Sequence, residues 1–184
     1  LGEQQTQLVY VEALLDDQRL TQAIHFKMLA NLFLAEGLPF KAARLLKENI
    51  EGGVLDDSIE NLELLSQAWY SAGEIDEAWP PLATAAELSE DGELYLRQAG
   101  LHLDAYRWGA ADTAAASAID KGGLDREGRA WLIRGMANVR LDKLDEAANH
   151  FKRAASDPAS KDYAEQWLAY TINEQRSQQV VANR

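Results

Sequence analysis

The sequence predicts an all-α protein built from stacked helical hairpins. Apolar residues recur at steps of three and four, as on the buried face of a helix, and only four of the 184 residues are proline. A small residue also recurs at steps of 36, 33 and 36 residues, at Ala42, Ala78, Ala111 and Ala147. A repeat of this length is typical of solenoids, in which each hairpin buries its apolar face against the next.

The repeat divides the chain into elements in order, within one continuous domain over 1–184. We expect an unpaired helix at about 3–16, hairpins at about 21–53, 57–90, 92–123 and 126–158, and a terminal helix at about 161–178. The turns within hairpins contain residues suited to a sharp reversal, at Gly37, Gly73 and Asp142. Glycine pairs at 52–53 and 122–123 are expected to end second helices, because glycine adopts a positive φ without strain.

The sizes and types of individual side chains predict where helices pack closely and where they begin. The recurring alanines lie where two helix axes approach most closely, and Leu46, Leu82 and Phe151 are expected to fill the space beside them. Other expectations concern helix starts and surface exposure. Asp57, followed by Glu60, is expected to cap a helix. The prolines of WPPL (80–81) are expected near a first turn, and Trp79 is the best candidate for an exposed aromatic residue.

The segment WLIRGMANVRLDKLDEAANHFKRAASDP resembles the tetratricopeptide repeat (TPR). Trp131 and Gly135 match its first helix, Ala147 and Phe151 its second, and Pro158 closes the unit. The resemblance implies a TPR-type right-handed superhelix of antiparallel helical hairpins, closed by a C-terminal capping helix. It also implies that the chain binds other proteins.

Longer phrases resemble a narrower group, the periplasmic TPR proteins encoded with TonB–ExbB–ExbD systems of gammaproteobacteria. The phrases are AEGLPFKAARLLKENIEGGVL, LSEDGELYLRQAG, AIDKGGLDREGRAWLIRGMA and SKDYAEQWLAY. The resemblance implies a periplasmic accessory protein without catalytic activity. It also implies a longer parent with further repeats upstream, and the unpaired helix at about 3–16 agrees with such a truncation. The start at Leu1, without Met, is expected either from removal of a signal peptide or from a fragment of a longer chain.

Composition argues against several other classes of function. The chain has 30 acidic and 18 basic residues and a net charge of −12, which disfavours binding to nucleic acid or to an anionic membrane surface. No apolar run is long enough for membrane insertion. There is no cysteine, and the three histidines fall on different hairpins. We therefore expect no enzyme activity, catalytic residue, cofactor or metal site.

The first helix of each TPR hairpin lines a concave groove, so the register predicts which side chains bind a protein or peptide. They are polar in the first half and apolar in the second: Lys27, Asn31, Glu63, Gln67, Tyr70, Leu96, Leu103, Leu132, Met136, Val139, Leu168 and Ile172. Lys27 and Asn31 resemble two members of a carboxylate clamp. Leu64 and Glu93 stand where that clamp needs Asn and Lys, so a receptor for C-terminal tails is not expected.

Three explanations stay open for the apolar half of the groove: a bound partner, closure by the chain's own helices, or a homodimer contact. The functional hypothesis is a non-catalytic scaffold or adaptor, with a TonB-system component as the partner that the resemblance implies. The alternative is a structural self-assembly module. The net charge of −12 favours a basic partner and faster association at low salt.

Overall fold

The structure is a computed structural model that describes residues 22–182. Within this range the chain is all-α, with short turns and no strand, as the sequence predicts. The expected helix at about 3–16 lies outside the described residues. No helix between residues 22 and 182 combines the length and the apolar character that a membrane crossing requires.

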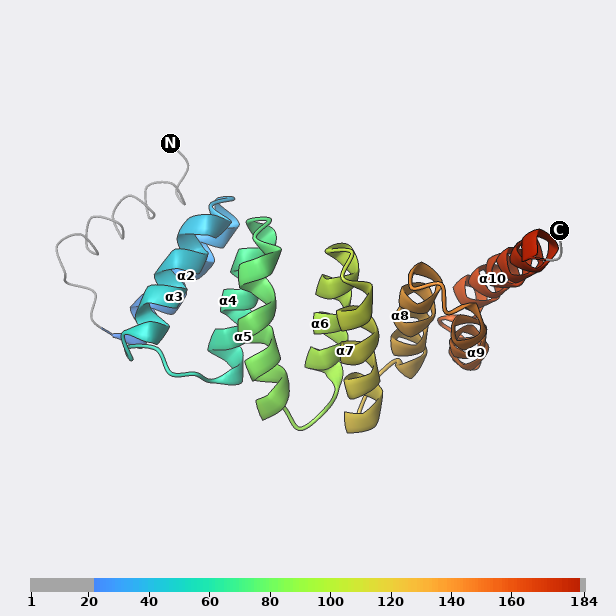
Figure 1. Cartoon of the computed structure of the whole chain (residues 1–184). Helices are drawn as coiled ribbons and strands as arrows, with labels where there is room; N and C mark the ends of the chain where they lie inside the picture. The colour runs from blue at the N-terminus through green and yellow to red at the C-terminus, as the bar shows by residue number, and fades with distance from the viewer. Residues whose placement is uncertain (1–21, 183–184) are drawn as a thin grey trace. The chain divides into compact units, whose positions relative to one another are not determined.

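The described helices follow one another as antiparallel hairpins (Figure 1). They are α2 (Ala23–Ala35), α3 (Pro39–Glu51), α4 (Ile59–Ser71), α5 (Ile75–Leu88), α6 (Glu93–Asp104), α7 (Trp108–Lys121), α8 (Glu127–Arg140), α9 (Leu144–Ala154) and α10 (Lys161–Ala182). The chain divides into two compact units between Leu88 and Ser89. The prediction of one continuous array across that boundary stays a prediction.

Within each unit, every helix packs against the next one along the chain. Unit 1 contains α2 to α5, and unit 2 contains α6 to α10. In unit 2, α8 also contacts α6 and α10, so α8 lies between these two helices. Alanine side chains of α7 make up much of the core that this helix forms with α6 and α8. Because alanine is small, the three helices can approach one another closely.

The small residues and their neighbours occupy the places expected of them. Ala42, Ala78, Ala111 and Ala147 are all fully buried. The larger residues beside them, Leu46, Leu82 and Phe151, are at most 1% exposed, which confirms the predicted register. Because these positions have no free space, they fix how near each second helix can lie to its partner.

The four turns within hairpins share one geometry. In each turn a backbone amide bonds to the carbonyl oxygen five residues earlier: Leu38 to Phe33, Glu74 to Trp69, Arg107 to His102 and Lys143 to Asn138, at 2.7–3.0 Å. Each turn also has one residue with positive φ, and Gly37, Gly73 and Asp142 are three of the four, as predicted. The fourth is Tyr106, with a φ of 58°, which the sequence did not indicate.

Three local expectations are wrong. Helix α4 has Ser58 rather than Asp57 at its N-cap position, and no side chain caps it there. Pro80 and Pro81 lie inside α5, past its first turn. The carbonyl groups that they leave without an amide partner belong to residues 76 and 77, whose exposed position lets water replace the lost bonds. Trp79 is half-buried, whereas Phe40 and several tyrosines are the exposed aromatic residues.

Candidate protein-binding site

The polar residues predicted for the groove lie on α2 and α4 of unit 1. Lys27 forms an ion pair with Glu60, with 3.3 Å between Nζ and Oε2. The Asn31 amide donates a hydrogen bond to the Lys27 carbonyl oxygen at 2.9 Å. On α4, Gln67 and Tyr70 are exposed. These side chains are therefore accessible, but Lys27 and Asn31 already have partners within the unit.

The apolar residues predicted for the groove lie in unit 2 and differ in burial. Leu96 is only 3% exposed and belongs to the core with the α7 alanines, so its assignment to the binding surface is wrong. Leu103 and Met136 pack partly against the same core. The remaining members are half-buried, namely Leu132, Val139, Leu168 and Ile172. A partner on this face stays a prediction, because the unit's own packing already covers part of it.

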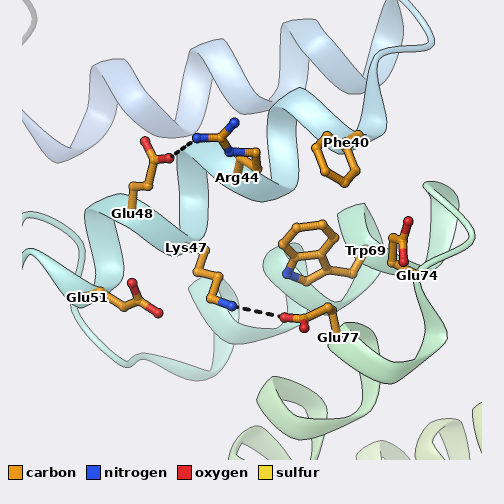
Figure 2. Close-up of a pocket in the computed structure, with 8 residues that line it drawn as sticks. All are labelled: Phe40, Arg44, Lys47, Glu48, Glu51, Trp69, Glu74 and Glu77. Atoms are coloured by element: carbon orange, nitrogen blue, oxygen red, sulfur yellow. Dashed lines mark hydrogen bonds and ion pairs between the residues drawn. The ribbon is translucent and has the colours of Figure 1, made fainter.

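A cleft of about 460 Å³ opens on unit 1, away from the predicted groove residues. We call it the Phe40 cleft. Its lining comes from α3, from the end of α4 and from the start of α5, as Figure 2 shows: Phe40, Arg44, Lys47, Glu48, Glu51, Trp69, Glu74 and Glu77.

Two aromatic rings form the apolar part of the cleft. Phe40 follows Pro39, whose fixed φ suits the first position of α3, and Trp69 lies near the end of α4. The ring centroids are 5.5 Å apart and the planes meet at 80°, an edge-to-face contact. Trp69 is only 5% exposed, whereas Phe40 is 49% exposed. Trp69 thus anchors the contact, while Phe40 presents an open aromatic surface.

Four carboxylates but only two cations surround these rings. The Arg44 guanidinium bonds to Glu48 at 2.8 Å, and Lys47 bonds to Glu77 at 3.0 Å (Figure 2). The hydrogen bond that Lys47 donates to Glu77 and the negative charge of Glu77 raise the pKa of Lys47, with a smaller contribution from Glu51. Lys47 Nζ also lies 6.0 Å from the centre of the Trp69 ring. Both cations of the cleft are therefore already paired.

Two carboxylates of the cleft remain without a hydrogen-bonded cation among residues 22–182. These are Glu51, at the end of α3, and Glu74, just before α5. The open Phe40 ring, with Glu74 on the same side of the cleft, suits a Lys or Arg side chain, because the ring and the carboxylate both attract its positive charge. Neither in the cleft nor elsewhere in the described part of the chain do three His, Asp or Glu side chains gather closely enough to hold a metal ion.

The sequence reasoning missed the cleft because it followed the first helices of the hairpins. The relevant pattern was present in the second helix, FKAARLLKENIE, where Phe40, Arg44 and Glu48 recur at steps of four. Residues four apart share a helix face, so this spacing predicts a charged, exposed face with one aromatic residue on it. The contribution of Trp69 from the neighbouring hairpin depends on tertiary packing.

No protein-family model matches the chain, and no curated protein matches it in sequence. Solved structures do resemble it. MamA is 22% identical over 88% of this chain and 86% of its own, with a TM-score of 0.68. PilF of Pseudomonas aeruginosa is 14% identical over 83% of this chain and 68% of its own, with a TM-score of 0.63.

A third solved structure, BtubC from P. vanneervenii, is 16% identical over 94% of this chain and 84% of its own, with a TM-score of 0.61. The fold is of the TPR type. At these identities the likeness concerns the fold alone, because one fold can carry many different surfaces and functions.

Proposed function

We propose that this chain is a non-catalytic protein-binding scaffold that holds a basic segment of another protein in the Phe40 cleft. The observation that carries the proposal is the combination of an exposed aromatic ring with two carboxylates that have no hydrogen-bonded cation. The TPR-type fold supports it, because stacked hairpins present side chains from several helices on one rigid surface.

The expected complex places one Lys or Arg of the partner between the Phe40 ring and the carboxylate of Glu74, and a second basic side chain at Glu51, which lies at the other end of the cleft (Figure 2). The apolar stem of the first side chain would cover the ring, and its charge would meet Glu74. Residues 1–88 carry 15 acidic and five basic side chains, so the long-range field of this unit also attracts a basic segment.

A displayed library of short random peptides tests this proposal. Peptides enriched on the whole chain are expected to contain Lys or Arg next to an apolar residue. The double variant Glu51→Lys/Glu74→Lys should weaken their binding by at least about tenfold, measured by calorimetry, since it replaces attraction with repulsion. Phe40→Ser should also weaken binding. The size of this loss should not depend on salt, because the substitution changes no charge.

The matched control is Glu36→Lys/Asp57→Lys, which changes the net charge equally but lies outside the residues that line the cleft. It should slow association only slightly. Equal losses in both double variants would mean that the cleft is not the site and that overall charge alone attracts the peptides. Enrichment of acidic or purely apolar peptides alone would also contradict the proposal.

The narrower assignment, a periplasmic accessory of a TonB-type energy-transduction complex, is a proposal that rests on the resemblance of the sequence phrases. Fractionation of cells that express the full-length protein tests the location. Binding of purified TonB-system components to the wild-type chain, lost in the Glu51→Lys/Glu74→Lys variant, tests the partner. Binding that survives in this variant would separate the partner from the cleft.

A further inference from the structure

Unit 2 contains a second concave surface, of different composition from the Phe40 cleft. A pocket of about 400 Å³ is lined by Arg140 at the end of α8 and by Gln166, Trp167 and Tyr170 on α10. The rings of Trp167 and Tyr170 meet edge to face, with centroids 5.8 Å apart. Trp167 also stacks on the buried Phe151, which ties this pocket to the core of the unit.

The pocket continues along the unit through contacts between rings and the arginine. The Cζ atom of Arg140 lies 5.7 Å from the centre of the Trp108 ring, and Trp108 meets Tyr106 edge to face at 5.5 Å. Tyr106, Trp108, Arg140, Trp167 and Tyr170 thus form a continuous strip, which we call the aromatic–arginine strip. Trp, Tyr and Arg are the residues most enriched at energetically important positions of protein interfaces.

The polar groups of the strip are nearly all donors. The guanidinium of Arg140, the indole N–H of Trp167 and the hydroxyl of Tyr170 have no hydrogen-bond or ion-pair partner among residues 22–182. No carboxylate lines the pocket. Hydrogen-bond donors around one positive charge are complementary to a negatively charged acceptor. A carboxylate is such an acceptor, and its two oxygens match the planar guanidinium of an arginine.

The backbone at Tyr106 gives a second, independent indication. At the equivalent place in the other hairpin turns the chain has Gly37, Gly73 and Asp142, residue types that tolerate a left-handed conformation. Tyr106 adopts the same conformation with a φ of 58°, and the residue is 76% exposed to solvent. An exposed tyrosine in a strained position adds nothing to the core, so its side chain is better explained by contact with another molecule.

We propose that the aromatic–arginine strip binds a segment of another protein in which an Asp or Glu stands beside apolar residues. The carboxylate bonds to Arg140, and the neighbouring apolar side chains cover the rings of Trp167, Tyr170 and Tyr106. The site is independent of the Phe40 cleft and prefers the opposite charge. A second copy of this chain is disfavoured as the occupant, because copies with a net charge of −12 repel each other.

The same peptide library tests the strip when the chain carries Glu51→Lys/Glu74→Lys, which removes the acidic cleft. Enriched peptides are expected to contain Asp or Glu next to apolar residues. Arg140→Glu should weaken their binding by at least about tenfold, and Arg129→Glu, an exposed arginine of α8 outside the pocket, should leave it nearly unchanged. Tyr170→Ala should also weaken binding, compared with Tyr163→Ala on the same helix.

Tyr106→Gly separates binding from folding. It removes the strained backbone and should therefore raise the melting temperature, yet it should weaken peptide binding. The proposal is overturned if the enriched peptides bind Arg140→Glu as tightly as the wild type, or if Tyr106→Gly leaves affinity unchanged. It is also overturned if ultracentrifugation shows that the wild-type chain self-associates and that Arg140→Glu abolishes this, because the occupant would then be a second copy.

Discussion

The two units share a way of packing and differ in the charge that they carry. In both, small residues are fully buried at the same repeat position, Ala42 and Ala78 in unit 1 and Ala111 and Ala147 in unit 2. Residues 1–88 nevertheless have a net charge of −10, from 15 acidic and five basic side chains, whereas residues 89–184 have a net charge of −2, from 15 and 13. The buried positions set the fold, and the outward positions are free to differ.

The two units also differ in the cations that contact their aromatic rings. In unit 1 they are lysines, with Lys41 over Phe33 and Lys47 over Trp69. In unit 2 three arginines contact tryptophans, with Arg134 and Arg153 over Trp131 and Arg140 over Trp108, and one lysine, Lys121, lies over Tyr95. A guanidinium stacks on a ring and still offers donors in a planar fork, so unit 2 is the better suited to bind a carboxylate.

The largest expected effect tests the shared packing. A Cβ atom at Gly135 on α8 would come within 3.0 Å of three atoms of the Phe151 ring. Phe151 is fully buried and stacked on Trp167, so it has little room to move. Gly135→Ala should therefore destabilise the protein by about 3 kcal/mol, at the upper end of overpacking costs. Chemical denaturation measures this loss.

The control is Gly100→Ala on α6, where a Cβ atom meets nothing within 4 Å. This change should stabilise by about 0.5–1 kcal/mol, because alanine favours the helix. Hydrogen exchange of Gly135→Ala sharpens the comparison, since α8 to α10 should lose protection before α2 to α5. Equal loss across both units would show that they unfold together and would break the division between them.

The next effect compares one ion pair from each unit. In unit 2 the Arg134 Nε–H donates to Asp112 at 2.8 Å, and both side chains are 22% exposed. In unit 1 Lys47 and Glu77 are 43% and 49% exposed. Asp112→Ala should cost about 1–2 kcal/mol, because it leaves a partly buried guanidinium without its acceptor. Glu77→Ala should cost less than about 1 kcal/mol, because water screens the exposed pair.

Thermal melting of the two variants at several salt concentrations measures this difference. The cost of Glu77→Ala should shrink as salt rises, whereas that of Asp112→Ala should change little. If the two variants lose equal stability with equal salt dependence, burial does not distinguish the ion pairs of the units.

The packing register could be predicted from the sequence, because it depends on residue size at a fixed spacing. The buried alanines and the turns at Gly37, Gly73 and Asp142 are examples. Tyr106 could not be predicted as a left-handed residue, because its side chain disfavours that conformation and only the equivalence of the four turns reveals it.

The candidate binding surface was harder to predict, because burial depends on the neighbouring helix. Leu96 has the spacing of a groove residue, yet the alanines of α7 leave space that Leu96 fills. The Phe40 cleft likewise needs Trp69 from the next hairpin. Periodicity identifies the face of one helix, and the size of the residues on the next helix decides whether that face stays exposed.

The environment of His150 makes unit 2 sensitive to acid. Burial lowers the pKa of His150 below its ordinary value of 6.5, and the charge of Arg134 lowers it further. The charge of Asp112 opposes this shift, and Arg153 and Glu146 have smaller effects, Arg153 lowering and Glu146 raising the pKa. The Nδ1 atom of His150 has no hydrogen-bond partner among the residues that the structure describes. Burial also lowers the pKa of His102, on α6 of the same unit.

The smallest expected effect is therefore a loss of stability at low pH that arises in unit 2. The folded state keeps His150 neutral, whereas the unfolded chain takes up a proton as the pH falls through 6.5. The stabilisation is fully present above this pH and is lost progressively below it. His150→Gln cannot be protonated in this range, so the melting temperature of this variant should depend less on pH than that of the wild type. His150→Gln/His102→Gln should flatten the profile further, and an unchanged slope in both variants would place the acid sensitivity outside these histidines.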